Sequence, residues 1–176
     1  MPNTTTPGET STSPPRQLDS GPVNEWLASA HPSPNTARTE WSSAARLALI
    51  PLGRRFEAIR LPEDIAHGAA QSDEPSTVGA WLARNLRGPV IHDPGFRRYY
   101  ALVPVGTHQA WSQRGTECLS NGTYLGVPRT DRAELDAETL ASYWLVPVTR
   151  PGHLCKAATV LEAVLLARVL ADEDES

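Results

Sequence analysis

The sequence predicts an α+β fold: a small mixed, mostly antiparallel sheet of about six short strands, with two or three helices packed on it. Strands and helices occur in groups along the chain, which favours this class over a parallel sheet of alternating strands and helices. Short apolar runs also end repeatedly in proline, which has no amide hydrogen for a central ladder and marks strand ends or edges. These runs end at Pro51, Pro62, Pro104, Pro128 and Pro147.

A chain of 176 residues fits one domain with tails. The first residues are rich in Thr, Ser, Pro and Gly and hold too little apolar surface to offset the entropy of the chain. Two short helices, over 23–30 and 36–47, are predicted before the sheet begins. The division that follows is a disordered tail 1–22, a weakly helical linker 23–45, a single α+β domain 46–171 and an acidic tail 172–176.

The first two strands are predicted over 47–52 and 56–61. In the second run Glu57 shares one face with Ile59 and Leu61, since alternate residues of a strand point the same way. The short connection Gly53-Arg54-Arg55 between the runs favours a hairpin.

Two helices are predicted next. Pro62-Glu63-Asp64 opens the first, because proline suits the first helical position and acids are favoured beside the amide end of a helix. Gly88-Pro89 ends the second, over 76–87. The apolar stripe of this second helix consists of Val78, Trp81, Leu82 and Leu86.

A second hairpin is predicted from 90–92 and 98–103. The intervening Asp93-Pro94-Gly95 is typical of a turn, since aspartate bonds back to the backbone and glycine accepts a positive φ. Two further strands, 123–127 and 143–148, are separated by the charged loop 129–138. A final helix is predicted over 156–171, with the inward residues Val160, Leu161, Val164, Leu165 and Val169.

The composition and the motifs of the chain limit the expected cellular location and the kinds of catalytic or metal site. The chain has two cysteines, no secretory signal pattern and no apolar run long enough to span a membrane, so a cytoplasmic protein without a membrane partner is predicted. The spacing of cysteines and histidines gives no paired ligands for a metal. Neither a glycine-flanked nucleophile nor a phosphate-binding glycine loop occurs. No catalytic residue, metal or cofactor is therefore predicted.

One hairpin combines an imidazole, a carboxylate and several arginines. Guanidinium groups could bind an anion there, and an aromatic ring could stack on a base. In the alternative interpretation, Asp93 stabilises the turn and Tyr99 and Tyr100 lie on opposite faces of the sheet. The candidates for anion or nucleic-acid binding are Arg54, Arg55, His92, Arg97, Arg98 and Tyr100.

Five phrases of the chain resemble a set of short uncharacterised proteins of high-GC Gram-positive bacteria, which are in turn similar to the N-terminal domain of bifunctional DNA primase-polymerases. The phrases are Pro51–Pro62, Gly88–Pro94, Tyr100–Pro104, Thr123–Pro128 and Tyr143–Pro147.

A working primase-polymerase needs two or three carboxylates on adjoining strands to hold two metal ions. This chain departs from that pattern, because Glu57 is alone within the predicted strands and Asp93 lies at a turn. The remaining acids with suitable spacing, Glu134, Asp136 and Glu138, lie in a predicted loop, and Asp172 and Asp174 lie in the acidic tail. The resemblance therefore implies a degenerate relative that keeps the sheet as a scaffold.

Three function classes follow. The sequence favours a cytoplasmic binding or regulatory domain without catalytic activity, whose partner is an unknown protein or small ligand. The alternative is a nucleic-acid-associated module, the degenerate relative of the primase-polymerase domain. The third class is an enzyme whose site would assemble from residues that are distant in sequence.

Overall fold

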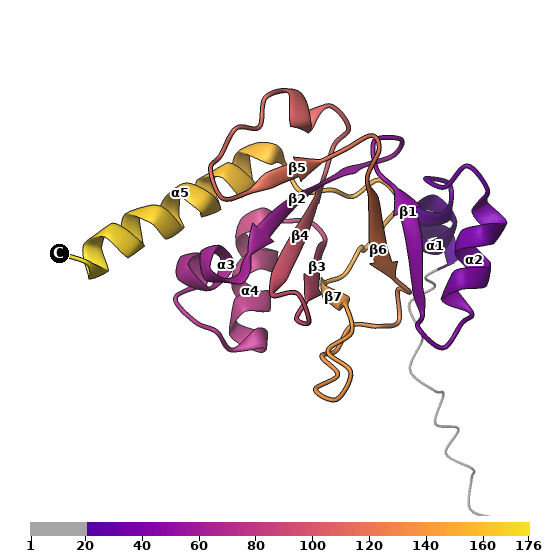
Figure 1. Ribbon diagram of the computed structural model, residues 1–176, viewed down its shortest axis with the longest axis horizontal. Coiled ribbons are helices and arrows are strands. Elements are labelled where there is room, and N and C mark those ends of the chain that lie inside the picture. Colours follow the sequence, from indigo (N-terminus) through magenta and orange to yellow (C-terminus); the bar gives the residue numbers. More distant parts are fainter. Residues whose placement is uncertain (1–20) are drawn as a thin grey trace, which may run out of the picture.

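The computed structural model describes residues 21–176, and within them five α-helices and seven strands form an α+β fold (Figure 1). The predicted fold class is confirmed. The helices are α1 (Gly21–Ala28), α2 (Pro34–Trp41), α3 (Glu63–Ala70), α4 (Pro75–Leu86) and α5 (Ala157–Asp174), with a short 3-10 turn η1 (Thr107–Gln109). The strands are β1 (Leu47–Pro51), β2 (Glu57–Pro62), β3 (Val90–Asp93), β4 (Arg98–Val103), β5 (Glu117–Leu119), β6 (Tyr124–Pro128) and β7 (Tyr143–Val146).

Five strands form the main sheet, in the order β5-β2-β4-β3-β7. Every strand pair in the described residues is antiparallel, so the mixed sheet that the sequence predicts is wrong in this detail. The hairpin of β3 and β4 is confirmed. The strand β5 was not predicted, because its three residues are too few to show a period.

Two apolar cores lie on opposite faces of this sheet. Along β4, Tyr99 packs in the core beneath α3, α4 and α5, whereas Tyr100 packs in the core shared with α1, α2 and the second sheet. Both side chains are buried, which confirms that the two tyrosines lie on opposite faces. The stripe of α4 is buried at Val78, Leu82 and Leu86, while Trp81 is half-buried.

The second sheet contains only β1 and β6, and the predicted hairpin of β1 with β2 is wrong. The chain leaves β1 through Leu52, whose amide donates to Thr123 O at 2.9 Å, and turns at Gly53 with φ 95° before it enters the main sheet. β2 is a central strand with β4 and β5 as neighbours. The short connection between β1 and β2 is typical of a hairpin. The apolar residues on both faces of β2, however, require that this strand is buried between two layers.

The two N-terminal helices belong to the compact body. Leu27 and Ala37 are fully buried, and the indole of Trp41 donates to Val127 O at 2.9 Å. The boundary expected near residue 46 therefore has no counterpart in the packing, because 21–45 contributes to the same core as β1 and β6. Of the predicted tail 1–22, residues 1–20 lie outside the described residues.

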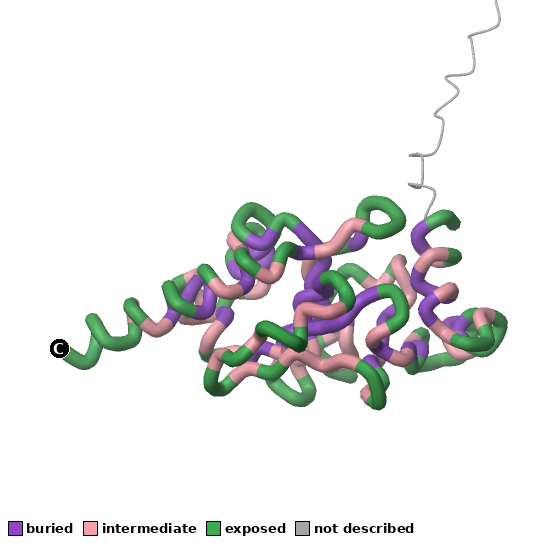
Figure 2. Tube along the Cα trace, turned by 90° about the horizontal axis from the view of Figure 1, so that it is seen from above, coloured by how far each residue is buried: buried purple, intermediate pink, exposed green. Residues whose placement is uncertain are grey.

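The last helix differs from its prediction at both its end and its face. It runs to Asp174, so most of the predicted acidic tail is helical (Figure 2). Val160 and Val164 are buried as predicted, but Leu165 and Val169 are exposed. No helix of residues 21–176 has the length and apolarity to cross a lipid bilayer.

Candidate functional site

An open cleft of about 990 Å³ lies where the two sheets meet. β6 and the start of β1 supply Leu47, Tyr124 and Leu125, and the main sheet supplies Tyr100 and the β3–β4 turn. The long segment between β6 and β7 completes the lining and lies below the two sheets in Figure 1. The cleft is therefore assembled from segments that are far apart in the sequence.

Two aromatic side chains make this cleft distinctive. Phe96 is 71% exposed and Tyr124 is 61% exposed, and both line the cleft. They are the exposed aromatic residues of the part of the chain that the structure describes. Exposed aromatic groups that share one concave surface are typical of binding sites.

The charged residues of the cleft are mostly acidic. The lining contains Asp93, Asp131, Glu134 and Asp136, against Arg46 and Arg132.

Most of these charges are already engaged within the chain. Asp131 is paired with Arg129 at 2.6 Å and approaches Arg46 at 3.9 Å. Asp136 accepts from the amide of Glu138 at 3.0 Å, and such backbone bonds lower the pKa of Asp136. Glu134 has no ion pair or hydrogen bond within residues 21–176, so its carboxylate is available to a cationic group.

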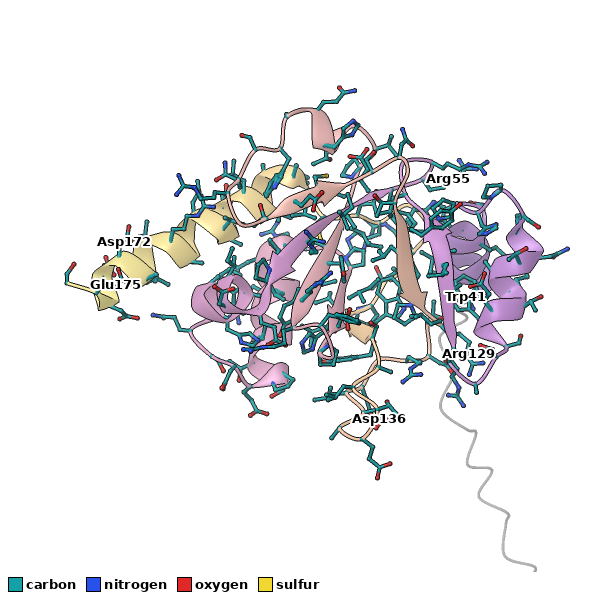
Figure 3. All side chains as sticks on the ribbon, viewed as in Figure 1. Trp41, Arg55, Arg129, Asp136, Asp172 and Glu175 are labelled. Carbon is teal, nitrogen blue, oxygen red and sulfur yellow. The ribbon has the colours of Figure 1, made fainter. Side chains whose placement is uncertain are left out.

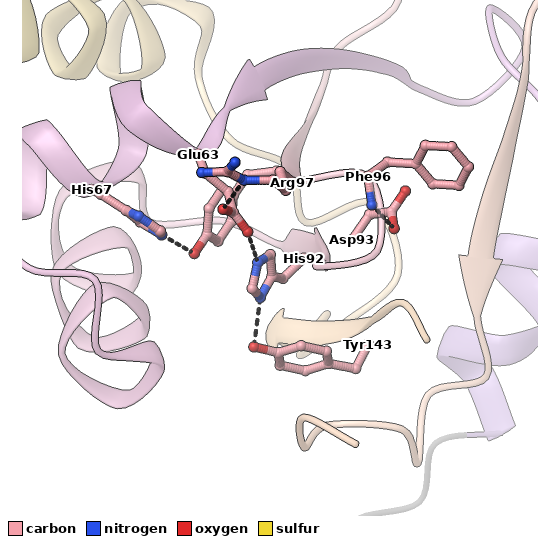
Figure 4. A network of polar contacts seen from close by, with 8 residues as sticks. Glu63, His67, His92, Asp93, Phe96, Arg97 and Tyr143 are labelled. Atoms are coloured by element: carbon pink, nitrogen blue, oxygen red, sulfur yellow. Dashed lines mark hydrogen bonds and ion pairs between the residues drawn. The ribbon is translucent and has the colours of Figure 1, made fainter. Parts of the chain in front are cut away.

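A buried polar network lies on the other face of the sheet, beneath the helices (Figure 4). His92 Nδ1 lies 2.7 Å from the hydroxyl of Tyr143, and His92 Nε2 lies 3.1 Å from Glu63 Oε1. The His92 ring stacks on Tyr99 with centroids 4.2 Å apart, and the Tyr99 hydroxyl meets His67 Nε2 at 2.8 Å.

The proton positions in this network follow from the burial of its groups. Burial lowers the pKa of His92, although Glu63 opposes the shift, so the ring is neutral near pH 7. Burial by itself would raise the pKa of Glu63, but hydrogen bonds from His92 and Arg97 bring it below its ordinary value. The carboxylate can only accept, so Nε2 carries the proton and Nδ1 accepts from Tyr143. Burial raises the pKa of that tyrosine to about 12, so it keeps its proton.

This network supports the turn that lines the cleft. Glu63 accepts from Arg97 Nε at 3.3 Å, and its own amide donates to Arg97 O at 3.1 Å. On the opposite face, Asp93 Oδ1 accepts from the amide of Phe96 at 3.4 Å, as the turn chemistry predicts. The side chain of Phe96 is thus held in the cleft by a turn that is fixed from both faces of the sheet.

A second buried carboxylate, Glu57, is fully enclosed at the start of β2. It accepts from the amides of Gly106 and His108 at 2.9 and 2.8 Å, from His108 Nδ1 at 2.8 Å and from Ser120 Oγ at 2.7 Å. Burial opposes ionisation, but these donors together lower the pKa of Glu57 to about 2. The carboxylate therefore closes the loop after β4 onto the sheet.

The cysteines have no activated thiolate. Cys118 lies beside Glu57, and burial together with that negative charge raises its pKa to about 12. Burial likewise raises the pKa of Cys155 to about 12. Both are free thiols. The described residues contain no group of three or more histidine, cysteine or acidic side chains placed to hold a metal ion.

The sequence-predicted binding residues do not form one site. Arg54 and Arg55 precede β2, whereas Arg98 pairs with Pro62 at its other end, about 20 Å away for a strand of this length. Figure 3 shows Arg55 at the end of the molecule opposite Asp136 of the cleft. Tyr100 lies in the cleft lining but is largely buried.

His92 and the neighbouring arginines have different surroundings. His92 is enclosed in the network, and Arg97 is paired with Glu63 while 82% of its side chain remains exposed. Arg98 lies over the ring of Phe96 at 5.3 Å. Sequence reasoning did not single out Phe96, Tyr124, Glu63, His67 or Tyr143. For Tyr124 a signal existed, since the alternation of Leu125 and Val127 in a strand places Tyr124 on the outer face.

Comparison with family models, with curated proteins and with solved structures gives no match to this chain.

Proposed function

We propose that the protein is a non-catalytic binding module whose cleft accepts an apolar or aromatic segment of a partner protein that also carries a basic residue. The observation that carries this proposal is the pair of exposed rings, Phe96 and Tyr124, in one cleft between the two sheets. Aromatic anchors in a concave apolar surface supply most of the free energy of many interfaces.

The basic residue follows from the charges of the cleft. Its lining carries four acids and two arginines. Arg132 donates to Ala45 O at 3.1 Å and Arg46 lies 3.9 Å from Asp131, so both guanidinium groups already have a partner within the chain. Glu134 is exposed, so a lysine or arginine of the partner would gain a pairing partner there.

In both polar networks the side chains already bind one another or backbone amides, which supports a non-catalytic role. His92 donates to one group and accepts from another, and it is almost fully buried. A general base needs to reach a substrate proton, and a nucleophile needs a lowered pKa or an adjacent base. The pKa of Cys118 and that of Cys155 are both raised, and the carboxylate beside Cys118, Glu57, has a pKa of about 2, which makes it a weak base.

The alternative function is a nucleic-acid-associated module, a degenerate relative of the primase-polymerase domain. The stack of Arg98 on the exposed ring of Phe96 favours it, because such pairs can hold an unpaired base. The acidic lining of the cleft opposes it, since phosphate groups would approach four carboxylates. The relationship to that family and the cytoplasmic location remain predictions.

Selection from a random peptide display library tests the proposal. The full chain is the bait, and a Phe96→Ala, Tyr124→Ala double variant serves for counter-selection. We expect enriched peptides to combine aromatic or aliphatic residues with lysine or arginine and to bind with a dissociation constant on the order of 10 micromolar. Phe96→Ala should weaken a synthesised hit at least about tenfold.

The matched control is Leu49→Ala, since Leu49 is 53% exposed on β1 and does not line the cleft. It should leave peptide affinity unchanged. Enriched peptides without apolar residues, or hits unaffected by Phe96→Ala, would overturn the proposal. A fluorescent oligo-thymidine is measured in parallel at low salt. Tight binding that falls steeply with added salt would select the nucleic-acid alternative.

A further inference from the structure

The outer face of α5 is an apolar stripe that no element of residues 21–176 covers. Leu165, Leu166 and Val169 are 46%, 39% and 54% exposed, and Leu161 is half-buried one turn before Leu165. The inner face of the same helix packs on the body through Val160, Val164 and Ala167. Because residues at i and i+4 stack along a helix, Leu161, Leu165 and Val169 form one continuous ridge.

The end of α5 extends beyond the body of the protein (Figures 1 and 2). Arg168 still contacts the body, since it donates to Gln113 Oε1 at 2.9 Å and to Arg114 O. The residues after it are exposed apart from the half-buried Leu170. The last turn contains Asp172, Glu173 and Asp174 and no basic residue, although the carboxyl end of a helix favours positive charge.

We propose that α5 pairs with α5 of a second copy of this chain, antiparallel and centred on Leu165. In this register Leu165 meets its own copy at the two-fold axis, and Leu161 of each chain meets Val169 of the other. The acidic end of each helix then lies beside the amide end of the other helix and beside Lys156, which is exposed at that end. This arrangement covers the apolar ridge, and it also places the acidic residues beside positive charge.

The charges select the antiparallel pairing. In a parallel pair the three acids of one helix would face the same three acids of the other, and like charges repel. The pairing also uses the projecting end, which reaches alongside the first turns of the copy. An arrangement in which the same patch is used by both chains closes at two subunits.

The interface is small, so the dimer should be weak. A helix of 18 residues is about 27 Å long. Interfaces at the low end of the size range bind transiently, so we expect a dissociation constant on the order of 10 to 100 micromolar. The proposal does not depend on the function of the cleft, because no residue of α5 lines that cleft.

Sedimentation velocity of the full chain from about 1 to about 500 micromolar measures the pairing. Wild type should pass from monomer to dimer in this range. Leu165→Glu and Leu165→Lys should each remain monomeric, because like charges would meet at the axis. An equimolar mixture of these two variants should recover the dimer, since position 165 of one chain faces position 165 of the other.

Two further variants sharpen the result. Leu49→Lys is the matched control, because Leu49 is 53% exposed on β1, which lies at the other end of the molecule from α5 (Figure 1), and it should leave the dimer intact. Neutralising the acids with Asp172→Asn, Glu173→Gln and Asp174→Asn should weaken an antiparallel dimer several-fold and would strengthen a parallel one.

Circular dichroism melts verify that each variant is folded. A wild type that stays monomeric to the highest concentration would overturn the pairing. A dimer that survives Leu165→Glu would do the same, and so would a mixture of the two charge variants that fails to associate.

Discussion

Glu57 and Glu63 are two carboxylates that each bind a histidine, but Glu57 is fully buried whereas Glu63 is half-buried, and the protein holds them by different means. Glu57 is bound by two backbone amides as well as by the side chains of His108 and Ser120. Glu63 is held by the side chains of His92 and Arg97. Burial opposes ionisation of both acids, but the four donors to Glu57 lower its pKa to about 2, and the bonds from His92 and Arg97 lower the pKa of Glu63. Backbone donors cannot rotate away, so they fix charge more firmly than side chains do.

Glu57→Gln should have the largest effect, because it changes the carboxylate that backbone amides hold. Both carboxylate oxygens accept from donors, so an amide nitrogen must face a backbone N–H that cannot turn away. We expect a loss of about 3 kcal/mol in the free energy of unfolding, measured by urea denaturation. The control is Glu138→Gln on the exposed loop, which should change it by less than about 0.5 kcal/mol. Equal effects of the two changes would contradict the role of Glu57.

Acid titration measures the contribution of Glu57 through its pH dependence, in wild type and in Glu57→Gln. The folded pKa of Glu57, about 2, lies below its ordinary value, so its contribution is complete above about pH 4.5. That contribution is lost as the pH falls through 4.5 toward 2, and it amounts to about 3 kcal/mol. The slope of stability against pH in this window should be shallower in Glu57→Gln. An unchanged slope would show that another group dominates acid unfolding.

Tyr143→Phe probes the network held by side chains. The change removes the donor to His92 Nδ1 and leaves a buried acceptor without a partner. We expect a loss of about 1 to 2 kcal/mol by the same denaturation measurement, smaller than that for Glu57→Gln. In the double variant Tyr143→Phe, His92→Ala the two losses of unfolding free energy should not add, because each change removes the same hydrogen bond. Full additivity would argue against the contact.

Arg97→Ala should have the smallest effect on stability. The side chain is 82% exposed, and exposed ion pairs contribute little, so the change should be under about 0.5 kcal/mol. Peptide affinity at the cleft should nevertheless fall a few-fold, because the turn that presents Phe96 loses its side-chain bond to Glu63 and keeps only the backbone bond. Lysine at this position should restore part of the affinity. A large loss of stability would instead place Arg97 among the structural residues.

Much of the fold could be predicted because its signals are local. The turn at Asp93-Pro94-Gly95 and the helix start at Glu63 depend on neighbouring residues only, and both are found where the sequence places them. The pairing of β1 with β6 could not be predicted, because the partner of Leu47 is Pro128 and no local pattern joins them.

The candidate site was less accessible to sequence reasoning. Phe96 and Tyr124 line one cleft only because the two sheets meet there. His92 binds Glu63 only because α3 begins directly after the end of β2. The chemistry of arginine and histidine indicates which residues can bind an anion. Whether each charge is free or already paired depends on the tertiary structure. The all-round apolarity of α5 explains why Leu165 and Val169 were assigned to its inner face.

The pairing of β1 with β6 also affects how the chain can fold while it is synthesised on the ribosome. α1, α2 and β1 leave the ribosome before β6. The indole of Trp41 and the side chain of Ile50 therefore have no contact with β6 until that strand has been synthesised. Closing so long a loop is entropically slow. Until Tyr124–Pro128 leaves the exit tunnel, the apolar residues that β6 covers in the folded protein are exposed to solvent.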